Sequence, residues 1–402
     1  MQQLVITRLS GRIVSALFCG NDLLQINVEP QNVSLLGSIY VGKVKNIVKN
    51  INAAFVEIAE NQMCYLSLNE KASPVFVKSK PNEKICIGDE ILVQISKDAI
   101  KTKNPSVTTK LQLAGKYMVL THGDKRISVS GKITEESIRN RLTTIIKGEV
   151  SKDRTFGIIV RTNAQDAEDA LLKVELKTLI EEYDTIVQQG IYRSCFSKIY
   201  EAPTGYLCDI RDGYDINIEN ILTDEKDIYD SIKQYLVKHQ PLDEAKLQFH
   251  EKENCSLNML YGIETKLKKA LQERVWLKSG GYLVIQPTEA LTVIDVNTGK
   301  AISGKKDVEK HFLKINCEAA KEIAKQLRLR NLSGIIVVDF IDMKEKGAKK
   351  ELISVLCTEL KKDSIKTTFV DMTKLNLVEI TRKKVRKPLH EQWKMDKNEV
   401  QG

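Results

Sequence analysis

Residues 291–299, Leu-Thr-Val-Ile-Asp-Val-Asn-Thr-Gly, and residues 335–342, Ile-Ile-Val-Val-Asp-Phe-Ile-Asp, are two apolar runs that each lead into an aspartate. Their β-branched residues lack helical spacing, and Gly or polar residues bound both runs, so each run predicts a short buried strand. Residues 311–330 lie between them and predict an amphipathic helix, because apolar side chains recur about every four positions (Phe312, Ile315, Ala319, Ile323, Leu327). A strand, a helix and a strand in this order predict a parallel βαβ unit.

The ends of these two strands gather the residues of a candidate metal site. In a parallel pair, Asp295 and Asp339 emerge at the same edge of the sheet, where open α/β sheets bind ligands, and Asn297 follows close behind the first. Carboxylate and amide oxygens are hard ligands that suit Mg²⁺, for which Mn²⁺ can substitute. One such motif alone would be explained equally well by an aspartate that caps a loop, whereas two in one basic chain favour a metal site. Asp342 either supports the ligands from behind or caps a loop.

The composition is that of an ordinary soluble protein for which a polyanion is a plausible partner. The 402 residues suggest two to four domains, and the net charge is +9. The eight cysteines are scattered without a Cys-x-x-Cys pair, which argues against a structural zinc site and for reduced, mostly buried thiols. The first residues lack the apolar core of a signal peptide, and no run approaches membrane-spanning length. We therefore expect a cytoplasmic protein.

The region before the aspartate motifs predicts several further modules. Residues 4–35 alternate apolar and polar side chains around Gly20-Asn-Asp22, which predicts a β-hairpin. The pattern remains that of strands up to about residue 120, and five strands fit a small OB-type barrel, a fold that commonly binds single-stranded nucleic acid. The five expected strands lie near residues 39–45, 53–58, 64–68, 90–95 and 111–114. Residues 120–213 predict a separate α/β module and residues 224–274 are mainly helical, so the fold class is multidomain α/β.

Several passages together resemble the ribonuclease E/G family of bacterial endoribonucleases, and the resemblance runs through essentially the whole chain. The passages that carry it are residues 39–44, 53–57, 160–162, 279–281, 288–299 and 334–343. The resemblance implies an RNase H-like subdomain, formed by residues 1–35 and 214–275, into which two modules are inserted. These are an S1-type OB barrel at residues 36–119 and a 5′-sensor α/β module at residues 120–213. A DNase I-like α/β catalytic subdomain would follow at residues 276–402.

The resemblance also implies an activity. Family members cleave single-stranded, often A/U-rich RNA to 5′-phosphate and 3′-hydroxyl ends, favour 5′-monophosphorylated substrates, and serve RNA processing, including that of ribosomal RNA, and RNA decay. The magnesium-binding and catalytic residues of the family match Asp295, Asn297 and Asp339. The two aspartates would hold Mg²⁺, and the asparagine would orient the attacking water or the phosphate. None of the five histidines lies in either motif, so a ribonuclease with histidine acid–base catalysis is not expected.

By the same resemblance, Phe55, Tyr65 and Lys103 match the residues with which the barrel grips RNA. Judged from its neighbours alone, Phe55 fits the barrel core equally well. Tyr65 is amphipathic and can stack on a base. Lys103 lies in a polar stretch, where a solvated charge is the alternative.

The 5′-monophosphate pocket of the family uses an Arg-Thr pair, which Arg161 and Thr162 match. A further arginine of that pocket is replaced here by Lys366. Lysine keeps the charge but loses the two-pronged hydrogen bonding of a guanidinium, so we expect a weaker preference for the 5′ end.

Two features near the end depart from the family pattern. The paired zinc ligands of the family are absent after the basic run Arg382–Lys387, so neither zinc nor a zinc-linked tetramer is expected, while oligomeric state and partner proteins stay open. The run itself fits contact with RNA phosphates or a solvated helix end. One alternative function is a non-catalytic RNA-binding protein that keeps the S1 barrel, against which the intact aspartate motifs argue. Another is a DNA nuclease, which would leave the barrel and sensor without a purpose.

Overall fold

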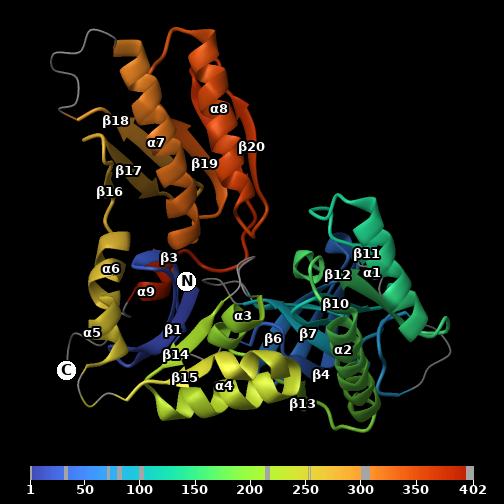
Figure 1. Cartoon of the computed structure of the whole chain (residues 1–402). Coiled ribbons are helices and arrows are strands. Elements are labelled where there is room, and N and C mark those ends of the chain that lie inside the picture. Colours follow the sequence, from blue (N-terminus) through green and yellow to red (C-terminus); the bar gives the residue numbers. More distant parts are fainter. Residues whose placement is uncertain are drawn as a thin grey trace, which may run out of the picture. The chain divides into compact units, whose positions relative to one another are not determined.

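The computed structural model describes residues 2–30, 35–69, 73–78, 84–98, 104–212, 218–251, 253, 255–299 and 308–394. The chain divides into two compact units, each assembled from segments that are separated in the sequence (Figure 1). The first unit comprises Met1–Pro30, Ile216–Lys233 and Ala245–Gly402, and the second comprises Gln31–Asp215 and Gln234–Glu244. Helix α4 (Lys226–His239) contributes residues to both units.

A five-stranded sheet in the first unit joins the N-terminal strands to strands from the middle of the chain. Its order is β15, β14, β1, β2, β3, with β1, β2 and β3 antiparallel and with β14 and β15 parallel to β1. The hairpin predicted around Gly20 is confirmed, because β2 and β3 pair on either side of it. The bounds are β1 Gln2–Leu9, β2 Arg12–Cys19, β3 Asp22–Val28, β14 Asn220–Thr223 and β15 Leu247–Phe249.

Three short helices pack on this sheet, and the first two of them, with α4, supply the helical character predicted between residues 224 and 274. They are α5 (Leu257–Tyr261), α6 (Ile263–Ala270) and α9 (Leu389–Trp393). Their apolar side chains share a core with strand residues such as Val5 and Phe18. Because α9 comes from the end of the described chain, the core of this sheet is complete only when both ends of the sequence are in place.

A six-stranded sheet in the first unit carries both aspartate motifs, in the order β16, β17, β18, β19, β21, β20. The predicted βαβ unit is confirmed: β18 and β19 pair in parallel from Leu291↔Ile335 to Asp295↔Asp339, and helix α7 (Val308–Leu329) lies between them in the chain. The bounds are β16 Arg274–Trp276, β17 Tyr282–Pro287, β18 Leu291–Asn297, β19 Gly334–Asp339, β20 Thr367–Met372 and β21 Leu377–Arg382.

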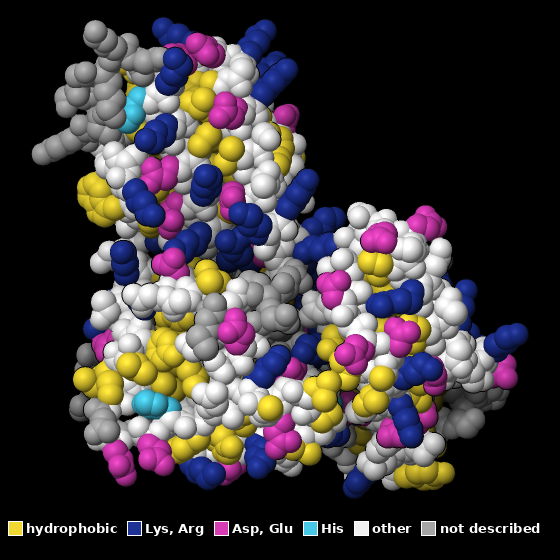
Figure 2. All heavy atoms as spheres, viewed as in Figure 1, with side chains coloured by type: hydrophobic (Ala, Val, Ile, Leu, Met, Phe, Trp, Pro, Cys, Tyr) yellow, Lys and Arg dark blue, Asp and Glu magenta, His cyan; other side chains and the backbone are white. Residues whose placement is uncertain are grey.

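Helices α7 and α8 (Lys346–Lys361) cover one face of this sheet (Figure 1). The predicted apolar stripe of α7 is confirmed, because Ile315, Ala319, Ile323 and Leu327 are all 0% exposed. Each isoleucine or leucine buried in this way stabilises the fold by about 1.5–3 kcal/mol. On the outer side of the helices, basic and acidic side chains are interspersed (Figure 2). The side chains that alternate with the buried strand residues, Asp295 and Asp339 among them, lie on the opposite, open face.

Five strands of the second unit close into the predicted barrel. They run in the order β4, β5, β6, β8, β7, and a pairing between β4 and β7 closes the ring, while β13 (Lys198–Tyr200) adds to β4 at its outside edge. The bounds are β4 Ile39–Val48, β5 Ala53–Ala59, β6 Gln62–Ser67, β7 Glu90–Lys97 and β8 Ser106–Thr108. The expectation that residues 111–114 supply the fifth strand is wrong, since the short strand β8 takes that place.

Residues 112–114 instead form β9, the edge of a four-stranded sheet with the order β11, β12, β10, β9. The boundary expected after residue 119 therefore falls within β10. Alternation of side chains predicts that a strand is present, but it does not name the partner with which the strand pairs. The bounds are β9 Gln112–Ala114, β10 Met118–His122, β11 Ile127–Val129, β12 Phe156–Val160, α1 Glu136–Glu149, α2 Asp169–Gly190 and α3 Gly205–Asp212.

Two features bear on the expected cellular setting. All eight cysteines are free thiols, but the expectation that most are buried is wrong, because only Cys64 is buried whereas Cys19 and Cys86 are exposed. Burial raises the pKa of the Cys64 thiol to about 11, which keeps it protonated and unreactive. In the described part of the chain, every helix is either too short or too polar to span a bilayer.

The basic run at Arg382–Lys387 begins with a buried arginine. Arg382 ends β21, and its Nε donates to Asp363 Oδ2 at 2.8 Å, with both side chains no more than 4% exposed. Its Nη1 donates to Asn331 Oδ1 and to the Leu332 carbonyl. The following residues up to Lys387 belong to neither a helix nor a strand, so the interpretation of the run as a helix end is wrong. Arg382 therefore has a structural role, whereas the next two residues, Lys383 and Lys384, are exposed.

We expect Asp363→Ala to lower the free energy of unfolding of the first unit by about 3–5 kcal/mol, because it leaves the Arg382 charge buried without its partner. Thermal and urea denaturation followed by circular dichroism would measure the loss. Lys384→Ala, in the exposed part of the same run, is the matched control and should change stability by less than about 0.5 kcal/mol. Equal stability of the two variants would contradict the structural role of Arg382.

Candidate functional site

The open face of the six-stranded sheet brings together the three residues predicted to be catalytic. Asp295 and Asp339 are direct neighbours in the parallel pairing of β18 and β19, whose backbones are about 4.8 Å apart in such a pair. Both carboxylates are exposed. Asn297 lies two residues beyond Asp295 on the same face, and its Nδ2 donates to Asp295 Oδ2 at 2.6 Å. The hydrogen bond leaves the carbonyl oxygen of the asparagine side chain as an acceptor beside the two carboxylates.

Electrostatic repulsion between Asp295 and Asp339 favours the binding of a cation between them. Partial burial and the neighbouring charges of Asp295 and Asp342 raise the pKa of Asp339 above its usual value. Asp342 also accepts a hydrogen bond from Asn376 Nδ2 at 3.2 Å, which ties it to the loop before β21. A divalent cation between Asp295 and Asp339 would relieve the repulsion.

The donor set fits Mg²⁺. Within the described ranges, no three or more His, Cys, Asp or Glu side chains are grouped closely enough to hold a metal. A closed protein cage is not what Mg²⁺ needs, however, because this ion is usually bound by one or two carboxylates and completes its shell with water and substrate phosphates. Two adjacent carboxylates on an exposed sheet face meet that requirement, whereas the all-protein tetrahedral shell of a structural zinc is a different arrangement.

The two barrel aromatics predicted to contact RNA are direct neighbours across strands β5 and β6. Phe55 pairs with Tyr65, and their rings meet edge to face with centroids 6.3 Å apart. Both side chains are partly exposed, and they alternate with Ala54, Val56 and Leu66, which fill the barrel core. The alternative interpretation of Phe55 as a core residue is therefore wrong. Lys103 lies outside the described residues.

Arg161 and Thr162, the predicted 5′-sensor pair, follow strand β12 in the second unit. The Nη1 group of Arg161 donates to Asp212 Oδ1 at 2.9 Å and to the Gly115 carbonyl at 2.7 Å. The Thr162 hydroxyl lies 3.0 Å from the Ser130 hydroxyl. The expected third member, Lys366, is an exposed residue of the first unit, just before β20.

Asp212 at the end of α3 is held between two arginines. Arg211 donates to it from Nε at 3.0 Å, in addition to the contact from Arg161. Although partial burial acts to raise it, the pKa of Asp212 is lowered by the charges and hydrogen bonds of Arg211 and Arg161. Asp212 is therefore ionised at neutral pH and anchors one edge of the Arg161 guanidinium.

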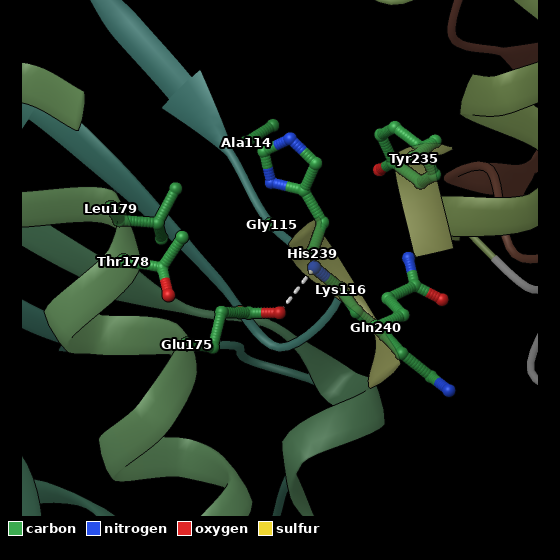
Figure 3. A pocket seen from close by; sticks show the side chains of 9 residues that line it. All are labelled: Ala114, Gly115, Lys116, Glu175, Thr178, Leu179, Tyr235, His239 and Gln240. Atoms are coloured by element: carbon green, nitrogen blue, oxygen red, sulfur yellow. Dashed lines mark hydrogen bonds between the residues drawn. The ribbon is translucent and has the colours of Figure 1, made fainter. Parts of the chain in front are cut away.

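The buried carboxylate of Glu175, which sequence analysis missed, stabilises the backbone next to Arg161. Glu175 of α2 accepts hydrogen bonds from three consecutive backbone N–H groups, those of Lys116, Tyr117 and Met118, at 2.7–2.9 Å. Figure 3 shows its carboxylate directed at the Lys116 backbone, beside a small cavity of about 10 Å³. Burial raises the pKa of Glu175, while the three N–H donors act in the opposite direction. One sequence signal existed, since Glu175 interrupts the apolar stripe of α2 three residues after Leu172.

The turn at residues 115–118, which Glu175 stabilises, also binds Arg161. Its carbonyls at Gly115 and Tyr117 accept from the side chain and from the backbone N–H of Arg161, respectively. A Cβ atom at Gly115 would lie 2.5 Å from the Glu175 carboxylate, so a larger residue there would displace this carboxylate. The position of the Arg161 guanidinium is thus set by Glu175 through the turn and by Asp212 directly.

Comparisons with known proteins point to one family. The family model described as "Ribonuclease E/G family" matches residues 112–385. Ribonuclease G of Haemophilus influenzae is 32% identical over 378 residues, which cover 91% of this chain and 76% of that protein. Ribonuclease G of Escherichia coli is 30% identical over 381 residues, covering 92% of this chain and 77% of that protein. Ribonuclease E of a Nostoc species is 31% identical over 389 residues, which are 94% of this chain but 55% of that longer protein.

Proposed function

The chain belongs to the ribonuclease E/G family and is an endoribonuclease, and from this premise we propose that it hydrolyses single-stranded, A/U-rich RNA with Mg²⁺ held at Asp295 and Asp339. The observation that carries the proposal is the parallel register that sets these two aspartates side by side on an open sheet face, with Asn297 bonded to the first. The protein would serve RNA processing, including the processing of ribosomal RNA, and RNA decay.

The proposed reaction divides its tasks among three side chains. Asp295 and Asp339 would hold Mg²⁺, which when bound polarises a phosphate oxygen and lowers the pKa of water. Asn297 keeps the Asp295 carboxylate in place through its Nδ2, and its neutral Oδ1 can accept a hydrogen bond from the attacking water without adding a third anion beside the RNA. The water would form the new bond to phosphorus and give up a proton to solvent as the bond to the 3′-oxygen breaks, and that oxygen would take up a proton from solvent. The products are a 5′-phosphate and a 3′-hydroxyl.

The topology supports the proposed subdomains. A sheet with three antiparallel strands followed by two parallel ones, in the order found for β3, β2, β1, β14 and β15, fits the RNase H-like subdomain proposed for residues 1–35 and 214–275. The closed barrel fits an S1-type module within residues 36–119, and the following sheet fits the sensor module of residues 120–213. The six-stranded sheet under α7 and α8 fits the DNase I-like catalytic subdomain of residues 276–402.

Two further sites would engage the substrate. On the barrel, the outward faces of Phe55 and Tyr65 would stack on bases, with Lys103 contributing charge. In the sensor module, Arg161 and Thr162 would bind a 5′-monophosphate. In the described part of the chain, only Nη1 of Arg161 has acceptors, so the edge formed by Nε and Nη2 can take a phosphate in a two-pronged fashion. By the resemblance, Lys366 would supply the second positive charge, as a single point of charge.

We expect Asp295→Asn and Asp339→Asn each to lower the cleavage rate by on the order of 10³-fold or more, because each removes an anionic ligand and with it several kcal/mol of charge stabilisation. The substitutions keep side-chain size, so folding and RNA binding should survive. A gel assay with 5′-labelled single-stranded RNA, with single-stranded DNA in parallel and with Mg²⁺ or EDTA, would measure the rates.

Asp371→Asn is the matched control for these variants, since Asp371 is another exposed carboxylate on the same sheet, at its β20 edge. It should cleave like the wild type. Full Mg²⁺-dependent activity in Asp339→Asn would refute the proposed site. A wild-type protein that binds RNA but cuts neither nucleic acid would instead support the non-catalytic alternative.

We expect Phe55→Ala and Tyr65→Ala to raise KM for single-stranded RNA by about fivefold or more, because base stacking on an aromatic side chain is worth roughly 1–3 kcal/mol per base. Neither change should unfold the barrel, since both rings lie outside its core. Ile58→Ala, which removes a fully buried side chain of the same sheet, is the contrast and should cost about 2–5 kcal/mol of stability. Unfolding of Phe55→Ala with unchanged KM in the folded fraction would disprove the stacking role.

We expect RNA with a 5′-monophosphate to be cut a few times faster than the same RNA with a 5′-hydroxyl or a 5′-triphosphate. Arg161→Ala should lower the rate on the monophosphate to that on the 5′-hydroxyl RNA, because it removes the two-pronged contact to the terminal phosphate, and Lys366→Arg should raise the rate on the monophosphate. The 5′-hydroxyl RNA is the internal control, on which both variants should match the wild type. Equal rates on all three RNAs in the wild type would show that the pocket does not sense the 5′ end.

A further inference from the structure

The open face of the catalytic sheet also carries an aromatic cluster that neither the aspartate motifs nor the barrel accounts for. It consists of Arg274 and Trp276 on β16 and Tyr282 on β17, and we call it the edge cluster. Val275 and Leu283 alternate with these residues and pack into the core under α7 and α8. The three side chains of the edge cluster therefore point away from the core, to the same face as Asp295 and Asp339.

The edge cluster is ordered by contacts among its own members. The rings of Trp276 and Tyr282 have centroids 5.2 Å apart at 57°. The Arg274 guanidinium lies 4.5 Å from the Tyr282 ring centroid and 5.7 Å from that of Trp276. Even so, Trp276 remains 64% exposed. An exposed tryptophan costs free energy in water, so a side chain held in this way suggests a ligand that covers it.

Strand pairing connects the edge cluster to the proposed catalytic residues (Figure 1). Tyr282 is the direct cross-strand partner of Asn297. Val284 is flanked by Arg274 on one side and by Asp295 on the other. Arg274 is thus two strands from Asp295, a distance of roughly 10 Å. A nucleotide adjoining a phosphate bound at the aspartates would reach the aromatic rings.

The chemistry of the edge cluster suits a nucleobase with its phosphate. Aromatic side chains stack on the face of any base, and arginine adds cation–π and phosphate contacts. Among the residues that the structure describes, none offers the Arg274 guanidinium a carboxylate, so its positive charge stays available to an anion. Without a cation, the carboxylates of Asp295 and Asp339 would repel the RNA backbone. The positive charge of Arg274, on the same face of the sheet, would offset part of this repulsion.

We propose that Arg274, Trp276 and Tyr282 form a nucleobase subsite that stacks on a base next to the scissile phosphate of single-stranded RNA. The inference rests on the proposed function, whose site it extends by two strands. Stacking tolerates any base, so the subsite positions the strand over Asp295 and Asp339 and does not read a sequence. Trp276 is its main platform, because it exposes the larger ring, and Arg274 holds the neighbouring phosphate.

The test uses the full-length protein and a single-stranded RNA oligonucleotide with one mapped cleavage position. The dissociation constant is measured by fluorescence anisotropy in EDTA, so that binding is read independently of cleavage. Trp276→Ala should weaken binding about five- to 150-fold, and Trp276→Phe should recover most of the loss. Phe249→Ala is the matched control, because Phe249 belongs to a similar cluster on the other sheet of the first unit, with the Tyr229 ring at 5.7 Å and Lys226 nearby. It should bind like the wild type.

A second arm locates the contact. One nucleotide at a time around the cleavage position is replaced by an abasic analogue. Wild-type protein should lose affinity at a position next to the scissile phosphate, whereas Trp276→Ala should bind the intact and the abasic RNA at that position equally.

Equal loss in both proteins at every position, or wild-type affinity of Trp276→Ala, would overturn the subsite. A change in the sedimentation coefficient of Trp276→Ala without a change in affinity would assign the edge cluster to self-association and would overturn it as well. Failure of the catalytic proposal is recognised separately, by cleavage that survives Asp295→Asn.

Discussion

The parallel pairing of β18 with β19 in one register is the constraint on which the proposed active site depends. Because side chains alternate along a strand, a slip of one residue would turn an aspartate into the core and an apolar residue into solvent. The apolar neighbours prevent this, since Ile294, Ile336 and Val338 are fully buried under the helices. Burial on one face of the sheet therefore determines the chemistry of the other, including the position of the edge cluster.

Those parts of the fold that rest on local patterns could be predicted from the sequence. The two aspartate strands, the α7 stripe and the hairpin at Gly20 each follow from the spacing of neighbouring residues. The barrel was predicted as a whole, but its fifth strand was misassigned because β8 spans only Ser106–Thr108, too short to show alternation. The strand at residues 112–114 shows the pattern clearly and yet pairs with β10, a choice that depends on tertiary contacts.

The residues of the candidate site also divide into those that local patterns predict and those that depend on tertiary contacts. Asp295, Asn297 and Asp339 could be found because their motif is contiguous with a strand and because parallel pairing brings strand ends together. Glu175 and Arg382 could not, since a charged residue predicts exposure until its partners are known, and the partners here are a backbone turn and a side chain elsewhere in the chain. The same holds for Asp212, whose anchoring of Arg161 joins residues 51 positions apart.

The discontinuous first unit has a consequence for how the protein is made. Strand β1 pairs with β14 at Gln3↔Asn220, so its partner is synthesised only 217 residues later. At about 5–20 residues per second, a ribosome needs roughly 10–45 s for that stretch. During this interval β1, β2 and β3 can form their hairpins, but one edge of β1 has no partner and offers its backbone hydrogen bonds to any extended strand. The second unit, in contrast, has nearly all of its sequence in one uninterrupted stretch. The order in which the segments leave the ribosome therefore favours folding of the second unit before β14 can pair with β1.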